Sequence, residues 1–270
     1  MSRSAAPAPD LLEAAARRLI AAADSGKPTP PVRDILGSDD IDAAYAVQNR
    51  VVDARIAGGA RIVGAKIGLT APVVQRQFGV KLPDFGVLFD DSTFVHAEEV
   101  PHQRFIQPRA EGEIALVLGH DLDRPRPTAA DVLRAVDFVL PAIEVVDSRI
   151  HDWDLTITDT IADNGSLGAI FLGTTPYSLR GLDLTRIGMT LEQDGEAVSF
   201  GAGHACLGSP VAAAVWLARE LASRGRQLRT GDIVMTGALG PMVPIGGPTS
   251  LRLRLDGLGE VDAVLTGVQT

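Results

Sequence analysis

Two short apolar runs in the middle of the chain carry acidic residues. Glu111 and Glu113 stand at the start of the run that ends at Leu118, and Glu144 lies inside the run Phe138–Val146. Apolar runs of this length, rich in β-branched residues, predict buried strands. An ionised carboxylate on a buried strand is costly unless a cation pairs with it or it shares a proton with a neighbour. The chain must therefore adopt a fold that supplies these strands with a compensating charge.

The spacing of the three acids predicts what that charge could be. Side chains alternate between the two faces of a strand, so Glu111 and Glu113 point the same way. With Glu144 they offer oxygen ligands only, and no His or Cys lies nearby, which favours a hard divalent cation such as Mg²⁺ or Mn²⁺. In the alternative interpretation, the first two acids are solvated at the start of their strand, and Glu144 pairs with an arginine such as Arg109 or Arg149.

Three further polar residues are candidates for the site. Lys66 is the only charge in the apolar strand predicted over Ile62–Ile67. A buried lysine needs an anion or a lowered pKa, and both are useful in catalysis on carboxylates. The alternative is a lysine at a sheet edge whose amine reaches water. Asp84 and Ser166 lie on turns that lead into apolar strands, where each is either a substrate ligand or a turn former.

Hydrophobic patterning predicts an α+β fold, with a helical segment over residues 1–60 and a catalytic mixed-β domain over residues 61–270. Helices are expected after Asp10, over Asp40–Ala57, after Thr128 and from Ser209 to about Gly225, with Asp10, Thr128 and Ser209 as caps. The expected strands are Ile62–Ile67, Val87–Phe94, Glu113–Leu118, Phe138–Val146, Ala169–Leu172, Gly188–Gln193, Glu196–Ser199, Ser250–Leu255 and Glu260–Leu265. The dipeptide Asp194-Gly195 predicts a two-residue hairpin turn.

Composition excludes several classes of function. The chain has 25 Lys and Arg against 34 Asp and Glu, a net charge of −9 that repels phosphate backbones and anionic lipid. Neither nucleic acid nor a membrane is therefore an expected partner. The single cysteine, Cys206, excludes an intrachain disulfide and a multi-thiolate metal site. The sequence contains no phosphate-binding loop, dinucleotide fingerprint or nucleophile elbow. We expect a soluble, cytoplasmic protein.

Seven motifs, in order along essentially the whole chain, resemble those of the 2-keto-4-pentenoate hydratases, a family of the fumarylacetoacetate-hydrolase-like superfamily. These motifs are Gly64–Thr70 (GAKIGLT), Pro83–Phe89 (PDFGVLF), Gln107–Val117 (QPRAEGEIALV), Leu140–Arg149 (LPAIEVVDSR), Ile161–Ser166 (IADNGS), Cys206–Pro210 (CLGSP) and the TGALGPMV of Leu228–Val243. The resemblance implies a rolled mixed β-sheet core of the fumarylacetoacetate-hydrolase C-terminal type, flanked by helices, and a homo-oligomer.

The resemblance also implies a role for each candidate residue. The metal ligands of the family fall on Glu111, Glu113 and Glu144, and its catalytic lysine, acid and serine fall on Lys66, Asp84 and Ser166. The implied cofactor is a divalent metal, Mg²⁺ or Mn²⁺. The chain has glycine at positions 112 and 165, where the family more often has alanine, and neither change removes a functional group.

The activity implied by the resemblance is the metal-dependent addition of water to 2-hydroxypenta-2,4-dienoate, giving 4-hydroxy-2-oxopentanoate in aromatic or steroid meta-cleavage catabolism. The implied partners are this small 2-oxo or 2-hydroxy-dienoate substrate and a downstream aldolase or sister decarboxylase. The nearest alternative is a 4-oxalocrotonate decarboxylase of the same superfamily. An alternative from another class is a non-catalytic subunit that stabilises a pathway enzyme.

Overall fold

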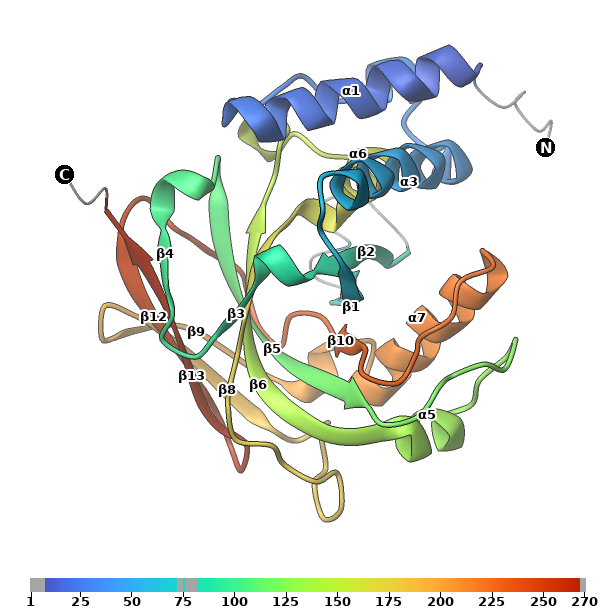
Figure 1. Ribbon diagram of the computed structural model, residues 1–270. Coiled ribbons are helices and arrows are strands. Elements are labelled where there is room, and N and C mark those ends of the chain that lie inside the picture. Colours follow the sequence, from blue (N-terminus) through green and yellow to red (C-terminus); the bar gives the residue numbers. More distant parts are fainter. Residues whose placement is uncertain (1–7, 72–74, 76–81, 268–270) are drawn as a thin grey trace.

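A curled, eight-stranded mixed sheet lies at the centre of the molecule (Figure 1). The computed structural model describes residues 8–71, 75 and 82–267. In spatial order the strands are β2 (Asp84–Phe89), β1 (Ile62–Gly68), β10 (Ile233–Met235), β5 (Pro108–Leu118), β6 (Val136–Asp147), β7 (Leu167–Leu172) and β3 (Thr93–Val95), and β11 (Val243–Pro244) pairs with β5. All pairs are antiparallel except β1 with β10 and β3 with β7.

A second, five-stranded sheet packs against the convex side of the long strands β5 and β6 (Figure 1). Its order is β4 (Glu99–Pro101), β13 (Gly259–Thr266), β12 (Thr249–Leu255), β8 (Gly188–Gln193) and β9 (Glu196–Ala202). The hairpin predicted between β8 and β9 is present, and both of its turn residues, Asp194 and Gly195, have positive φ angles of 51° and 86°.

The helices form two groups (Figure 1). One group covers one end of the first sheet and contains α1 (Pro9–Ser25), α2 (Arg33–Leu36), α3 (Ile41–Ala57) and α6 (Ile157–Ala162). The other pairs α5 (Ala129–Ala135) with α7 (Pro210–Ser223). Single 3-10 turns are η1 (Asp90–Ser92), η2 (His102–Arg104), η3 (His151–Trp153), η4 (Asn164–Ser166) and η5 (Gly203–Ala205). No helix in the described ranges is both long and apolar enough to cross a bilayer.

Side chains alternate between the two faces of β5, so this one strand contributes to both the apolar core and the candidate site. Ala110, Ile114 and Leu116 face the second sheet and belong to the main apolar core. Gly112 lies on the same face, where an added Cβ would stand 2.5 Å from Leu253 Cδ1. The absence of a side chain there lets the two sheets approach closely. The acidic residues between these positions are consequently directed to the concave side of the first sheet.

The predicted fold class and the curled mixed sheet are confirmed, whereas some local predictions are wrong. The single strand expected over Val87–Phe94 is two strands, because η1 interrupts it. In that turn the Asp90 carboxylate accepts hydrogen bonds from the amides of Arg61 and Asp91, which replaces strand pairing by a side-chain-capped turn. The short strand β10 and the helix α6 were not expected, since neither is long enough to give a periodic signal.

Predictions for helix starts had mixed success. Thr128 and Asp131 form a complete capping box at α5, and Ser209 accepts from the amide of Val211 ahead of α7, as expected. The cap expected at Asp10 is wrong: α1 begins at Pro9, and its first turn has no side-chain cap. Proline is favoured at the first helical position because its missing N–H would be unpaired there in any case.

Gln48 connects the helix α3 to the strand β2 and to the helix α6. Its buried side-chain amide on α3 donates to the carbonyl oxygens of Phe85 on β2, at 2.7 Å, and of Ile161 on α6, at 3.0 Å. A buried carbonyl group without a hydrogen-bond donor is costly. This one amide on α3 therefore stabilises the contact of α3 with both β2 and α6.

We expect Gln48→Leu to lower the unfolding free energy by about 2–4 kcal/mol, because two buried carbonyls lose their donor. The melting temperature should fall by roughly 5–15 °C, measured by differential scanning calorimetry. The matched control is Gln103→Leu at an exposed position, which should change the unfolding free energy by less than about 0.5 kcal/mol. Equal melting temperatures for the two variants would contradict this role of Gln48.

Candidate metal centre and catalytic cavity

Three glutamates converge on the concave face of the first sheet. Glu111 on β5 lies directly opposite Glu144 on the antiparallel neighbour β6, and Glu113 is two residues further along β5 on the same face. Each of the three offers a carboxylate oxygen, and these oxygens all lie within 4.8 Å of one another. The structure therefore brings together the acids that the sequence analysis selected.

The glutamate cluster is under electrostatic strain without a cation. Burial, then the charge of Glu144, raises the pKa of Glu111 to about 7. The same two causes raise the pKa of Glu113 well above its usual value. Glu113 Oε2 accepts a hydrogen bond from the amide of Gly237 at 2.8 Å, but Glu113 Oε1 and Glu144 Oε2 have no hydrogen-bond partner within the described ranges. Buried, unpartnered carboxylate oxygens at this spacing fit the coordination of a hard divalent cation.

Lys66 on β1 reaches the cluster from the other side of β10. Its Nζ lies 2.7 Å from Glu144 Oε1, and only 2% of the residue is exposed. Burial by itself lowers the pKa of Lys66, but the neighbouring Glu144 and Asp84 outweigh that effect and raise the pKa. The edge-lysine interpretation is therefore wrong, and so is the pairing of Glu144 with an arginine. The partner of Glu144 is the buried Lys66.

Asp84 begins β2 opposite Gly68 of β1 and is also buried. Its Oδ1 has no hydrogen-bond partner in the described part of the chain. Burial raises the pKa of Asp84, and the charge of Lys66 opposes the rise. A Cβ at position 68 would collide with Asp84 Oδ1, so glycine is required for this carboxyl group to face the cavity. A carboxyl group with a raised pKa is suited to act as a general acid or base.

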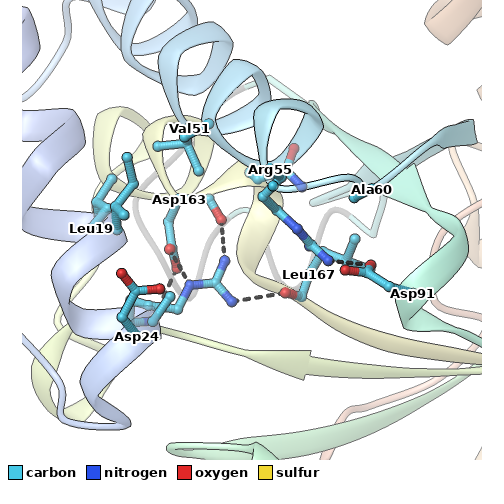
Figure 2. Close-up of a pocket in the computed structure, with 14 residues that line it drawn as sticks. Leu19, Asp24, Val51, Arg55, Ala60, Asp91, Asp163 and Leu167 are labelled. Atoms are coloured by element: carbon cyan, nitrogen blue, oxygen red, sulfur yellow. Dashed lines mark hydrogen bonds and ion pairs between the residues drawn. The ribbon is translucent and has the colours of Figure 1, made fainter.

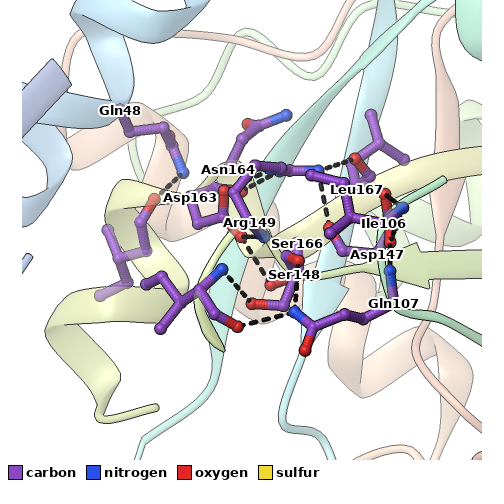
Figure 3. A network of polar contacts seen from close by, with 12 residues as sticks. Gln48, Ile106, Gln107, Asp147, Ser148, Arg149, Asp163, Asn164, Ser166 and Leu167 are labelled. Atoms are coloured by element: carbon purple, nitrogen blue, oxygen red, sulfur yellow. Dashed lines mark hydrogen bonds and ion pairs between the residues drawn. The ribbon is translucent and has the colours of Figure 1, made fainter. Parts of the chain in front are cut away.

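Ser166 is held by a buried ion pair (Figure 3). Its Oγ donates to Asp163 Oδ2 at 3.0 Å, while Asp163 Oδ1 accepts from Arg149 Nε at 2.5 Å. Arg149 also donates to the carbonyl of Leu167 at 2.8 Å, which fixes the start of β7. Asn164, Gly165 and Ser166 all have positive φ angles near 55–60°. A left-handed φ angle is costly for the non-glycine residues Asn164 and Ser166. The surrounding hydrogen bonds therefore hold this turn in its strained conformation.

A small cavity of about 60 Å³ joins these groups. Its polar lining comes from Lys66, Asp84, Glu111, Thr160 and Ser166, and its apolar lining from Leu69, Val146, Trp153, Leu155 and Met242. Gly165 also lines it, and a Cβ there would stand 2.7 Å from Lys66 Cε. The cavity thus brings one glutamate of the cluster together with a cation, a carboxyl group and a hydroxyl in partly apolar surroundings, a combination of groups expected of an enzyme site.

Some of the residues that build this site are not predicted from the sequence. Asp163 and Arg149 form the ion pair behind Ser166, Thr160 lines the cavity, and Trp153 covers one side of it. Asp163 follows the apolar residues Ile161 and Ala162, so its burial could have been predicted from the sequence. Its arginine partner could not, because the two are brought together only by the antiparallel return of β7 along β6.

A larger pocket of about 440 Å³ lies behind the same network, between α1, α3 and the turn at residues 163–167 (Figure 2). It contains none of the predicted site residues. Its two arginines already have carboxylate partners: Arg55 pairs with Asp91, and Arg149 pairs with Asp163. The chemistry is therefore concentrated in the smaller cavity.

Comparisons with known proteins agree with this geometry. Residues 62–266 match the family model of the fumarylacetoacetate (FAA) hydrolase C-terminal domain. The chain is 50% identical over 253 residues to 2-keto-4-pentenoate hydratase of Paraburkholderia xenovorans (strain LB400), with 94% of each chain covered. It is also 50% identical over 249 residues to the TodF product hydratase of Pseudomonas putida (strain F1), covering 92% of this chain and 93% of that one.

A solved structure has the same architecture over almost the whole chain. The 4-oxalocrotonate decarboxylase from Pseudomonas putida G7, complexed with magnesium and adipate, superimposes with a TM-score of 0.92. The two proteins are 32% identical, and the match covers 98% of this chain and 100% of the other.

Adding Mg²⁺ or Mn²⁺ at about 100 times its dissociation constant should stabilise the protein by about 2.7 kcal/mol, because the cation binds only the folded cluster. We expect the melting temperature to rise by roughly 5–10 °C in a thermal-shift titration. Glu111→Gln and Glu113→Gln should abolish the rise, whereas Glu99→Gln at an exposed position should keep it. A rise of the same size in all three variants would place the cation elsewhere.

In EDTA, the protein should lose stability as the pH rises from about 4.5 to 7. The pKa of Glu111 is raised from 4.5 to about 7, so the folded state binds more protons than the unfolded state in this window. This contribution is fully present below 4.5 and is lost as the carboxyl group ionises in the fold. Urea midpoints at pH 5, 6 and 7 measure the trend. Glu111→Gln should flatten it relative to Glu99→Gln, and an identical slope in both would contradict the assignment.

Proposed function

Because the chain belongs to the fumarylacetoacetate hydrolase family and, within it, to the 2-keto-4-pentenoate hydratases, we propose that it adds water to 2-hydroxypenta-2,4-dienoate to give 4-hydroxy-2-oxopentanoate. This activity makes it a hydro-lyase. The observation that carries the proposal is the convergence of Glu111, Glu113 and Glu144 beside Lys66 and Asp84, in a chain half identical to a named hydratase.

The glutamate cluster supports Mg²⁺ or Mn²⁺ as the cofactor. The three carboxylates would hold the ion and leave positions for a bidentate guest, and the unpartnered oxygens of Glu113 and Glu144 fit this role. When bound, the ion supplies Lewis acidity that stabilises negative charge on the C2 oxygen of a 2-hydroxy-dienoate. The magnesium in the 32% identical decarboxylase structure supports the same choice.

The protein's own residues would then orient the substrate and move protons. Lys66, kept charged by Glu144, holds an oxygen of the substrate by a charge-assisted hydrogen bond. The raised pKa of Asp84 suits it to exchange a proton with C5 or with the attacking water at C4. Ser166, oriented by Asp163, positions the water or the substrate hydroxyl. Leu69, Val146 and Leu155 give the rest of the cavity an apolar lining.

The second candidate is decarboxylation of 4-oxalocrotonate, because the decarboxylase of Pseudomonas putida G7 has nearly the same backbone, with a TM-score of 0.92. Identity favours the hydratase, at 50% against 32%. A non-catalytic subunit would have no need for a buried cluster whose charges destabilise the empty fold.

Several finer parts of the proposal rest on the family resemblance. We propose a homo-oligomer in the cytoplasm that acts in aromatic or steroid meta-cleavage catabolism, next to a downstream aldolase or a sister decarboxylase. We also propose that residues 1–60 form a helical segment and residues 61–270 the catalytic domain. The start of the family match at residue 62 supports that division.

A diode-array assay with 2-hydroxypenta-2,4-dienoate tests the proposal. With Mg²⁺ or Mn²⁺ the dienol absorbance should disappear and 4-hydroxy-2-oxopentanoate should form, whereas EDTA should stop the reaction. Asp84→Asn should lower kcat by about 100-fold or more with KM changed less than about 3-fold, because a positioned acid–base group contributes 10²–10⁴-fold. Asp39→Asn, at an exposed position, is the control. Release of CO₂ from 4-oxalocrotonate without hydration of the dienoate would favour the decarboxylase.

A further inference from the structure

Arg109 lies beside the glutamate cluster and, among the residues that the structure describes, pairs with no carboxylate. It precedes Glu111 by two residues on β5, so its side chain leaves the strand on the same face. No ion pair to Arg109 occurs within the described ranges, and its polar side-chain contact there is a weak one, from Nη1 to the sulfur of Met242 at 3.5 Å. Burial lowers the pKa of Arg109, and Glu111 opposes this change. The guanidinium is thus partly desolvated while most of its donors are unused.

An aromatic platform holds this guanidinium in place. The Arg109 guanidinium carbon lies 4.2 Å from the ring centroid of Trp153, one of the residues that line the cavity. The Trp153 ring is fixed in turn, because its Nε1 donates to the carbonyl of Gln107 at 3.1 Å. The Gln107 side chain donates to the carbonyls of Ser148, at 3.0 Å, and Ile150, at 2.8 Å. The loop before α6 therefore fixes the orientation of the Arg109 guanidinium.

Backbone strain in that loop supports a functional role. Asp152 and Trp153 are consecutive non-glycine residues with φ angles of 55° and 57°. Each such residue costs of the order of 1 kcal/mol or more, and strain of this kind collects at binding sites. The strained pair carries the Trp153 ring, which lines the cavity and stacks with the Arg109 guanidinium.

The charges of the site indicate what Arg109 could bind. Four carboxylates belong to the cluster and the cavity, those of Glu111, Glu113, Glu144 and Asp84. Lys66, Arg109 and a divalent cation together balance them, so a substrate monocarboxylate would enter a neutral site. Without Arg109 it would enter a site with one net negative charge, which repels the same carboxylate.

We propose that Arg109, stacked on Trp153, binds the C1 carboxylate of the substrate and selects 2-oxo and 2-hydroxy acids over their uncharged analogues. This inference rests on the proposed function for the identity of the substrate. Arg109 reaches the cavity through two of its lining residues, Trp153 and Met242, beside Glu111. Asp84 and Thr160 line the cavity from β2 and α6 instead, so we assign the C1 end of the substrate to Arg109. The remaining donors of the planar guanidinium match the two oxygens of a carboxylate.

Binding of pyruvate and pyruvamide to the Mg²⁺-loaded protein, measured by calorimetry, tests the assignment. The amide lacks the negative charge but keeps the shape and the 2-oxo group. Arg109→Met should reduce the preference for pyruvate over pyruvamide by about 10- to 100-fold, the size expected for a charge-assisted pair. Because the amide changes the interaction with the metal equally in both proteins, the ratio of the two preferences isolates Arg109. Arg109→Lys should retain part of the preference.

The matched control is Arg104→Met. Arg104 is an exposed arginine that also stacks on an aromatic ring, that of Phe94, at 5.5 Å, but Phe94, unlike Trp153, does not line the cavity. It should keep the full preference for pyruvate. In the hydration assay Arg109→Met should raise KM for the dienoate about 10-fold or more with kcat changed less than about 3-fold.

An unchanged pyruvate preference in Arg109→Met, in a variant whose melting temperature equals that of the parent, overturns the inference. A purely structural role would lower the melting temperature and affect pyruvate and pyruvamide equally, which also overturns it. A third outcome separates this inference from the proposed function: the parent protein does not hydrate the dienoate, and the Arg109→Met variant binds pyruvate with less preference than the parent. In that case the proposed function fails and the carboxylate site stands.

Discussion

The structure depends on the repulsion between carboxylates that two neighbouring strands force together. Glu111 and Glu144 occupy paired positions on β5 and β6, and Glu113 follows on the same face. Strand pairing leaves them no way to separate, so the surrounding chain must supply positive charge. Lys66 supplies part of it through its 2.7 Å contact with Glu144, while burial and the charge of Glu144 still raise the pKa of Glu111.

The second sheet and the turn that carries Ser166 hold the glutamate cluster and its neighbours in place. On the far side of β5, close packing at Gly112 against Leu253 of the second sheet prevents the strand from rotating its acids away. On the near side, the ion pair of Arg149 with Asp163 fixes the turn that carries Ser166. The binding groups thus lie on strands and on a tied turn, and little rearrangement is needed before a ligand binds.

Much of this site could be predicted because it has charged residues inside apolar runs. Glu144 in an apolar run and Lys66 in another are recognisable from the sequence, since a buried charge requires a partner. The identity of the partner was open: the sequence allowed Glu144 to pair with an arginine, whereas the fold pairs it with Lys66 of β1, although β10 and β5 lie between β1 and β6 in the sheet. The platform of Trp153 under Arg109 could not be predicted, because it depends on a strained loop without a periodic pattern.

By itself, the sequence determined which charged residues stand in apolar runs, which face of β5 Glu111 and Glu113 share, and the class of metal that their oxygens suit. These properties follow from residue type and from the two-residue period of a strand. Only the tertiary structure decided which charges meet, because β1, β5 and β6 are brought together by β10 and by the curl of the sheet. Distances between segments far apart in the chain depend on the packing of both sheets, and no local pattern encodes that packing.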